Sequence, residues 1–125
     1  MGLSTLAKNY MLERGLRNTS PTNYMQYAGL FTGDPDPDSG TQHEVTGGTP
    51  TYGRQSITWA AASGGSMTAS NQPTFNVPGG PTTVTHVGFF SASTAGDYYG
   101  MADVTDETFN SQGTYTITSI LVQLS

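Results

Sequence analysis

Apolar side chains recur at helical spacing only near the start of the chain, at Leu3, Leu6, Ala7, Tyr10 and Met11. Ser4 stands where a helix N-cap belongs, because its hydroxyl can accept a hydrogen bond from a free backbone N–H of the first turn. Two ends fit the pattern, one at Gly15 and one a turn later after Leu16 and Arg17. A helix of about three turns is marginal alone, so we expect it to pack on the domain's own sheet or on a neighbouring subunit.

The rest of the chain has the pattern of short β-strands separated by turns. β-branched and aromatic residues dominate several segments, and glycine, proline, serine and asparagine separate them. The strand candidates are residues 24–32, 54–60, 66–71, 73–77, 82–90, 98–104 and 114–125. Turns are expected at 63–65, 78–81, 93–97 and around Asp106 and Glu107, and the stretch 33–52 is a long connection.

The last strand region changes its apolar phase. Tyr115 and Ile117 share one face, whereas Ile120, Val122 and Leu124 share the other, which indicates a bulge or a bend where the strand changes sheets. Seven or eight strands at such spacing predict a mainly β fold, an antiparallel β-sandwich of jelly-roll type with one N-terminal helix. We expect a helix or arm at 1–17 and a single sandwich domain at 18–125.

Composition and charge limit the classes of function that the protein can have. Only 10% of the 125 residues are charged, against roughly a quarter in an average globular protein. The net charge of −5 disfavours a nucleic-acid partner. Three of the four basic residues lie in the first 17 positions, so a slightly basic segment precedes an acidic body. No apolar run approaches the ~20 residues of a membrane span, and the absence of cysteine excludes disulfides and thiolate chemistry.

The stretch "GDPDPDSG" at 33–40 resembles the start of an EF-hand calcium loop, because Asp34, Asp36 and Asp38 match its first three ligand positions. The later positions of the stretch do not match the EF-hand loop. Ser39 stands where the turn glycine belongs, and Val45 stands where the closing glutamate belongs. The stretch is therefore interpreted as a solvated acidic loop, with calcium binding by the three aspartates as the weaker alternative and no metal site otherwise predicted.

No enzyme signature is found. His86 lies inside a strand, and His43 lies in the long connection next to Glu44, where it is a weak ligand candidate. Three acids, Asp103, Asp106 and Glu107, are interpreted as turn or strand-end residues rather than as a catalytic pair. We therefore predict no catalytic residue and no cofactor.

Two aromatic pairs, Phe89–Phe90 and Tyr98–Tyr99, are adjacent on strands, so the two rings of each pair point to opposite faces. One ring of each pair packs in the core, and the other either contacts another subunit or lies under a second layer such as the N-terminal helix. The residues predicted as subunit contacts are Leu6, Tyr10, Arg14, Arg17, Phe90 and Tyr99.

The order of segments resembles a family of small virion proteins of tailed bacteriophages, described as head-decoration or tail-fibre-like proteins. The resemblance runs over nearly the whole chain, from "LAKNYMLERGL" and "YAGLFTGDP" to "TYTITSILVQLS". Its most specific part is "EVTGG" followed by "YGRQSITW" and "VTHVGFF". The resemblance implies a β-sandwich structural subunit of a phage particle without enzymatic activity.

The first functional hypothesis is a capsid decoration (cement) protein on the outer surface of a phage head. Its partners would be the major capsid protein and further copies of itself, held by burial of apolar surface. The slightly basic helix would face the acidic shell. Two alternatives stay open, namely a tail or baseplate adaptor or fibre-like receptor-binding component, and a small carbohydrate- or calcium-binding β-sandwich.

Overall fold

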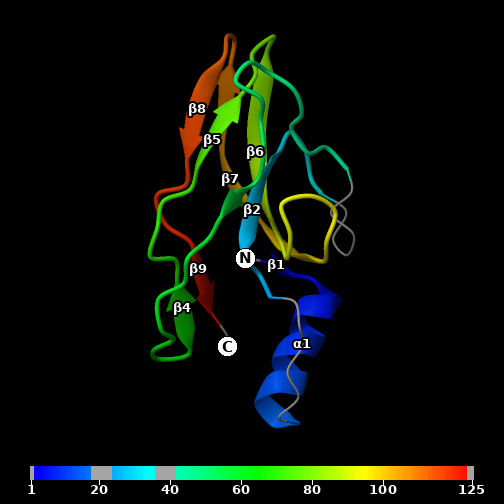
Figure 1. The fold of residues 1–125 in the computed structure, drawn as a ribbon, viewed down its shortest axis with the longest axis vertical. Helices are drawn as coiled ribbons and strands as arrows, with labels where there is room; N and C mark the ends of the chain where they lie inside the picture. Colours follow the sequence, from blue (N-terminus) through cyan, green and yellow to red (C-terminus); the bar gives the residue numbers. More distant parts are fainter. Residues whose placement is uncertain (1, 18–23, 36–41, 124–125) are drawn as a thin grey trace.

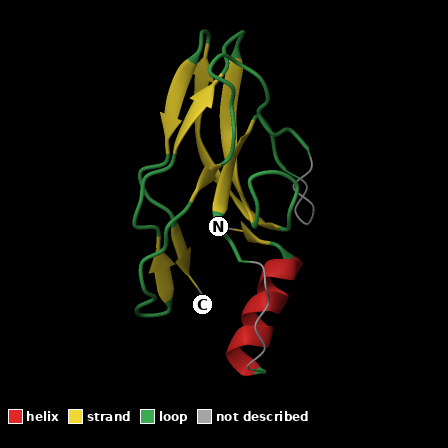
Figure 2. Ribbon diagram, viewed as in Figure 1, coloured by secondary structure: helices red, strands yellow, loops and turns green. Residues whose placement is uncertain are grey.

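The computed structural model describes residues 2–17, 24–35 and 42–123, which form one helix and nine strands. Figures 1 and 2 show two layers of strands with the helix extending below them. The elements are β1 (Gly2–Leu3), α1 (Thr5–Leu16), β2 (Tyr27–Phe31), β3 (Gln55–Ser56), β4 (Ser66–Thr68), β5 (Thr74–Val77), β6 (Thr82–Phe90), β7 (Tyr98–Phe109), β8 (Gly113–Thr116) and β9 (Leu121–Gln123). The predicted antiparallel β-sandwich with an N-terminal helix is confirmed.

The larger layer is an antiparallel sheet in the order β1-β7-β6-β2-β3, and the opposite layer consists of the pairs β5–β8 and β4–β9. The segment after β3 crosses between the layers. Gln55 and Ser56 pair with β2, whereas Trp59 bridges to Ala69 beside β4. The predicted strand 54–60 is therefore short in each sheet, because it changes partners midway.

A bulge keeps the apolar side chains of β6 on the inside. The register between β6 and β7 shifts between Val84 and His86, so Val84 and then Val87 and Phe89 all enter the main core, although strict alternation would separate them. From the other layer, Phe75 contributes a fully buried ring to the same core. The predicted phase switch at the C-terminal end is also confirmed, since β8 pairs with β5 whereas β9 pairs with β4.

The turn predicted around Asp106 and Glu107 is wrong. Both residues lie inside β7, which continues to Phe109, and Glu107 pairs with Val84 of β6. Both acids are exposed there, as are their neighbours Thr105 and Thr108, so this part of β7 is solvated on both faces and accepts charged residues without a loop. The chain reverses instead between β7 and β8, at residues 110–112.

The opposite face of the large sheet carries a second aromatic cluster, made of Phe31, Phe90 and Tyr98. It is covered by Arg54, whose guanidinium carbon lies 3.5 Å from the Phe90 ring centre. The other members of the two aromatic pairs, Phe89 and Tyr99, belong to the main core. The two rings of each pair thus occupy opposite faces, and each is covered by the chain itself.

Arg54 also forms a largely buried ion pair with Glu44. Its Nε and Nη2 donate to the two carboxylate oxygens of Glu44, both at 2.9 Å, and its Nη1 donates to the carbonyls of Ala92 and Ala95. The Tyr52 hydroxyl donates to Glu44 Oε2 at 2.8 Å. Burial, followed by the Glu44 charge, raises the pKa of Tyr52 well above its ordinary value. The Arg54 side chain therefore holds the connection before β3 against the loop after β6.

Ser4 attaches the helix to the sheet. Its Oγ accepts from the Ala7 backbone N–H at 3.2 Å, which confirms the predicted N-cap, and donates to the Tyr98 carbonyl at 2.6 Å. The Ser4 backbone N–H donates to the Tyr99 carbonyl. The helix continues through Gly15 to Leu16, so the longer of the two predicted helices is the one observed. The division at residue 17 stays a prediction, because residues 18–23 lie outside the described residues.

We expect Arg54→Met to lower the free energy of unfolding by about 3–5 kcal/mol, because it leaves the Glu44 carboxylate without its cation in a largely buried place. Urea unfolding followed by Trp59 fluorescence measures the change. The matched control is Arg17→Met, which removes an exposed pair with Glu13 and should cost below about 1 kcal/mol. Equal effects of the two variants would contradict the assigned role of Arg54.

We expect Ser4→Ala to destabilise the protein by about 1–2 kcal/mol, because it removes both the helix cap and the bond to the Tyr98 carbonyl. Asn9→Ala, at an exposed position of the same helix, is the control and should leave stability nearly unchanged. Hydrogen exchange of the α1 backbone amides distinguishes the Ser4 variant from the control. Faster exchange is expected in the Ser4 variant alone, and unchanged exchange there would contradict the anchor.

Candidate functional site

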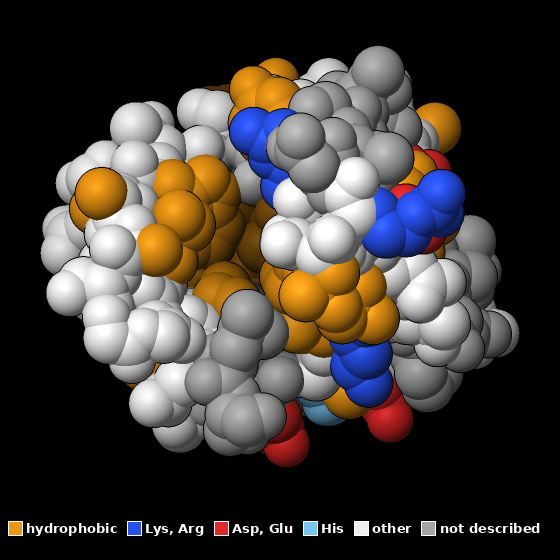
Figure 3. Space-filling view, turned by 90° about the horizontal axis from the view of Figure 1, so that it is seen from below, with side chains coloured by type: hydrophobic (Ala, Val, Ile, Leu, Met, Phe, Trp, Pro, Cys, Tyr) orange, Lys and Arg blue, Asp and Glu red, His pale blue; other side chains and the backbone are white. Residues whose placement is uncertain are grey.

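An apolar groove of about 810 Å³ lies between α1 and the β4–β9 pair. Figure 3 views it from below, where hydrophobic side chains surround the hollow. The groove opens at the end of the sandwich where the helix extends beyond the sheet. Its walls come from segments far apart in the sequence.

One wall is a single face of the helix. The residues that form it are spaced by three or four positions, as one helical face requires: Ala7, Tyr10, Met11, Arg14 and Gly15. Ala7 is fully buried against the core, so the helix is fixed on one side and borders the groove on another. Gly15 adds no side chain, which leaves the groove open near the end of the helix.

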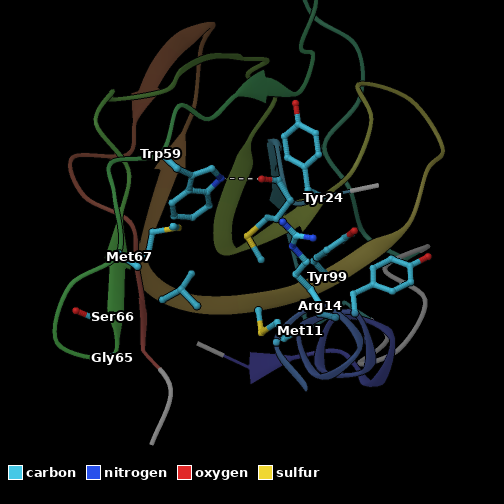
Figure 4. Close-up of a pocket in the computed structure, with 14 residues that line it drawn as sticks. Met11, Arg14, Tyr24, Trp59, Gly65, Ser66, Met67 and Tyr99 are labelled. Atoms are coloured by element: carbon cyan, nitrogen blue, oxygen red, sulfur yellow. Dashed lines mark hydrogen bonds between the residues drawn. The ribbon is translucent and has the colours of Figure 1, made fainter. Parts of the chain in front are cut away.

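The other wall belongs to the opposite layer. It is formed by the β4 segment and by β9, through Ala62, Gly65, Ser66, Met67 and Val122. Figure 4 shows Met67 and Trp59 facing Met11 and Arg14 of the helix across the groove. Apart from Ser66, the side chains of this wall carry no polar group, so it suits an apolar occupant.

Met25, Trp59 and Tyr99 complete the lining from the core side, with Tyr24 at the margin. The Trp59 indole N–H donates to the Met25 carbonyl at 2.7 Å, which fixes the ring in place. Because the indole donor is already used, Trp59 offers the groove an apolar ring face.

Two of the three tyrosines that line the groove, Tyr10 and Tyr99, are held as neutral phenols. The Tyr10 hydroxyl donates to Asp97 Oδ2 at 3.1 Å, and burial together with that carboxylate raises the pKa of Tyr10. Burial, followed by the neighbouring Tyr10 and Asp97, raises the pKa of Tyr99 well above its ordinary value. The Tyr99 hydroxyl is buried and has no hydrogen-bond partner among the described residues. Arg14 is therefore the one charged residue of the described lining.

Of the six predicted contact residues, three line the groove: Tyr10, Arg14 and Tyr99. Leu6 is half-buried and packs against the main core, and Arg17 is exposed and paired with Glu13. Phe90 lies on the opposite face of the large sheet under Arg54. Whether these residues contact another subunit stays a prediction, although Phe90 and Tyr99 are almost fully covered within the chain itself.

Sequence reasoning missed the wall opposite the helix. Met67 and Val122 come from strands that pair with each other, and only this pairing places them beside α1. Trp59 shares one face of the strand candidate 54–60 with Ile57, and that position gives no sign of a groove. An available signal was the presence of methionines in three separate segments, since Met11, Met25 and Met67 all line the groove.

The candidate metal ligands are not brought together by the described part of the chain. Asp34 is exposed, whereas Asp36 and Asp38 lie outside the described residues. Glu44 is held by Arg54 and Tyr52. Among the described residues, no group of three histidine, aspartate or glutamate side chains is placed to hold a metal ion. Calcium binding by the acidic loop stays a prediction.

The two histidines have local partners. His86 Nδ1 lies 2.8 Å from the Thr85 hydroxyl, and the His43 carbonyl accepts from the Thr32 backbone N–H at 2.9 Å. The acids of β7, Asp103, Asp106 and Glu107, are exposed along the strand. Within the described ranges, no helix has both the length and the apolar character needed to cross a membrane.

Comparison with known proteins gives one family. The family described as Podophage GP4 fiber I protein gp80 matches residues 2–125, which includes the helix, both layers of the sandwich and the groove. No curated protein matches the chain. The expected resemblance to small virion proteins of tailed phages is thereby confirmed, and the chain belongs to the Podophage GP4 fiber I protein gp80 family.

Proposed function

We propose that the protein is a non-enzymatic, fibre-type structural subunit of a phage virion, and that it assembles through the end of the sandwich that carries the groove. The family supports the coarser part of this proposal, a structural phage protein of the fibre-like class. The finer part, the assembly surface, is argued from where the apolar side chains lie.

The observation that carries the proposal is the position of the exposed large hydrophobic residues. In the described part of the chain these are Leu12, Leu16, Tyr24 and Leu121. Two lie on α1, one lines the groove and one lies on β9. Large apolar side chains that are exposed near one end of a soluble protein indicate an interaction site. The other end of the sandwich exposes mainly threonine, serine and acidic side chains.

A capsid decoration protein is the second candidate, and one observation favours it. The helix carries Lys8, Arg14 and Arg17 against the single acid Glu13, whereas the body of the chain is acidic. A basic helix would suit an acidic outer shell by electrostatic complementarity. The same helix borders the groove, so the two candidates use one end of the molecule and differ in its location on the particle.

The copy number and the location on the particle distinguish a fibre subunit from a capsid decoration protein. We expect quantitative mass spectrometry of purified particles to give a copy number that is a small multiple of that of the portal, with the protein found at the tail by cryo-electron microscopy. Symmetric assembly around the tail axis limits the number of fibre subunits, whereas a decoration protein follows the capsid lattice. A copy number comparable with that of the major capsid protein would contradict the fibre proposal.

Incorporation of variants tests the assembly surface. Met67→Glu places a charge in the apolar groove, and burying that charge would cost several kcal/mol. We expect at least a tenfold loss from particles produced with this variant. Thr105→Gln, at an exposed position of β7, is the control and should be incorporated as the wild type is. Normal incorporation of the Met67 variant would exclude the groove end as the assembly surface.

A further inference from the structure

The helix that borders the groove also carries an apolar ridge on another side. Leu12 and Leu16 are 54% and 79% exposed, and they lie one turn apart. At about 100° per residue, this pair points away from the helix face that lines the groove. Each copy of the chain therefore presents an unfilled apolar groove and a protruding pair of leucines.

We infer that the groove receives α1 of a second copy of this chain, with Leu12 and Leu16 as the inserted side chains. This inference rests on the proposed function, because it names the partner at the same assembly surface. The groove volume of about 810 Å³ lies in the range of about 300–1,000 Å³ that accommodates a buried ligand, so two leucine side chains fit. Insertion of an apolar helix face into a hydrophobic groove is a common mode of recognition.

Charge supports this arrangement. Glu13 follows Leu12 directly on the helix, and Arg14 lines the groove. Insertion of the ridge therefore brings a carboxylate of the entering copy toward a guanidinium of the receiving copy. Glu13 pairs with Arg17 within its own helix, in an exposed pair, and such pairs contribute little and re-form at little cost.

The alternative contact between two copies is ridge against ridge. It would bring Lys8, which lies one turn before Leu12 on the ridge side, against a second helix whose charged residues are mostly basic, and like charges at close range are unfavourable. It would also leave both grooves open to water. Insertion of the ridge into the groove covers the exposed leucines of α1 and the lining of the groove in one contact.

The ridge and the groove are different surfaces of one chain, so two copies can insert their ridges into each other's grooves in a closed dimer, or each copy can pass its ridge to the next. Passed on in this way, the contact repeats from copy to copy, and it closes into a ring when the rotation between neighbours allows. In a ring, every copy gives one ridge and receives one ridge.

Light scattering on the purified chain over a concentration series tests the inference. We expect the wild type to self-associate, as a dimer or a larger ring, and at least a tenfold weaker association for the ridge variant Leu12→Gln/Leu16→Gln. The groove variants Met67→Glu and Ala62→Glu should weaken association to the same extent. Ala62 is exposed, so its variant keeps the test valid if Met67→Glu fails to fold. Thr105→Gln is the control and should associate as the wild type does.

Mixing the variants separates the two kinds of contact. The ridge variant keeps an intact groove, and the groove variant keeps an intact ridge, so an equimolar mixture should form a one-to-one heterodimer and nothing larger. A mixture that stays monomeric would overturn the inference. Because the chain has no cysteine, Leu16→Cys mixed with Met67→Cys should give a disulfide-linked pair, whereas neither should crosslink efficiently with itself.

Failure of this inference is distinct from failure of the proposed function. If the wild type is monomeric at all concentrations, or if the ridge variant associates normally, a second copy is not the occupant. Loss of the Met67→Glu variant from particles would then still support the groove end as the assembly surface, with a different virion protein in the groove.

Discussion

The side chain on which the arrangement of this small domain depends most is Arg54. It is one of only four basic residues, and it pairs with Glu44, donates to two carbonyls of the loop after β6 and stacks on Phe90. These contacts hold two long connections over a face of the large sheet that would otherwise expose aromatic rings. Gly29 makes the arrangement possible, because a Cβ there would lie 2.8 Å from the Glu44 carboxylate and would push it away.

Because Arg54 and its partners cover that face of the large sheet, the apolar side chains that remain exposed to solvent lie elsewhere on the molecule. The second layer covers one side of the large sheet and the Arg54 cluster covers part of the other, so the groove end is where large apolar side chains reach solvent. The helix is held there by Ser4 at one end and packs on β7 through Tyr10 and Tyr99, whose ring centres are 5.9 Å apart. Attachment near its first turn lets the rest of the helix extend beyond the sandwich.

The local pattern of the sequence was enough to predict the helix cap at Ser4, the opposite faces of the aromatic pairs and the change of partner near Ile120. Each of these depends on neighbouring residues and on the period of a helix or strand. The strand through Asp106 was missed because acids are typical of turns, and only the pairing with β6 shows that the strand continues to Phe109. The groove was missed for a related reason, since Met67 meets Met11 only through a contact between distant segments.

Three methionines in the groove have a consequence for how the protein is handled. Thioether side chains are flexible and polarisable, so this lining can adjust its shape to an occupant more readily than branched side chains could. The same atoms react with peroxide, and each sulfoxide formed would place a polar group on an apolar surface. If the groove is the assembly surface that we propose, oxidative ageing of a preparation would reduce its capacity to assemble, and a methionine sulfoxide reductase would restore it.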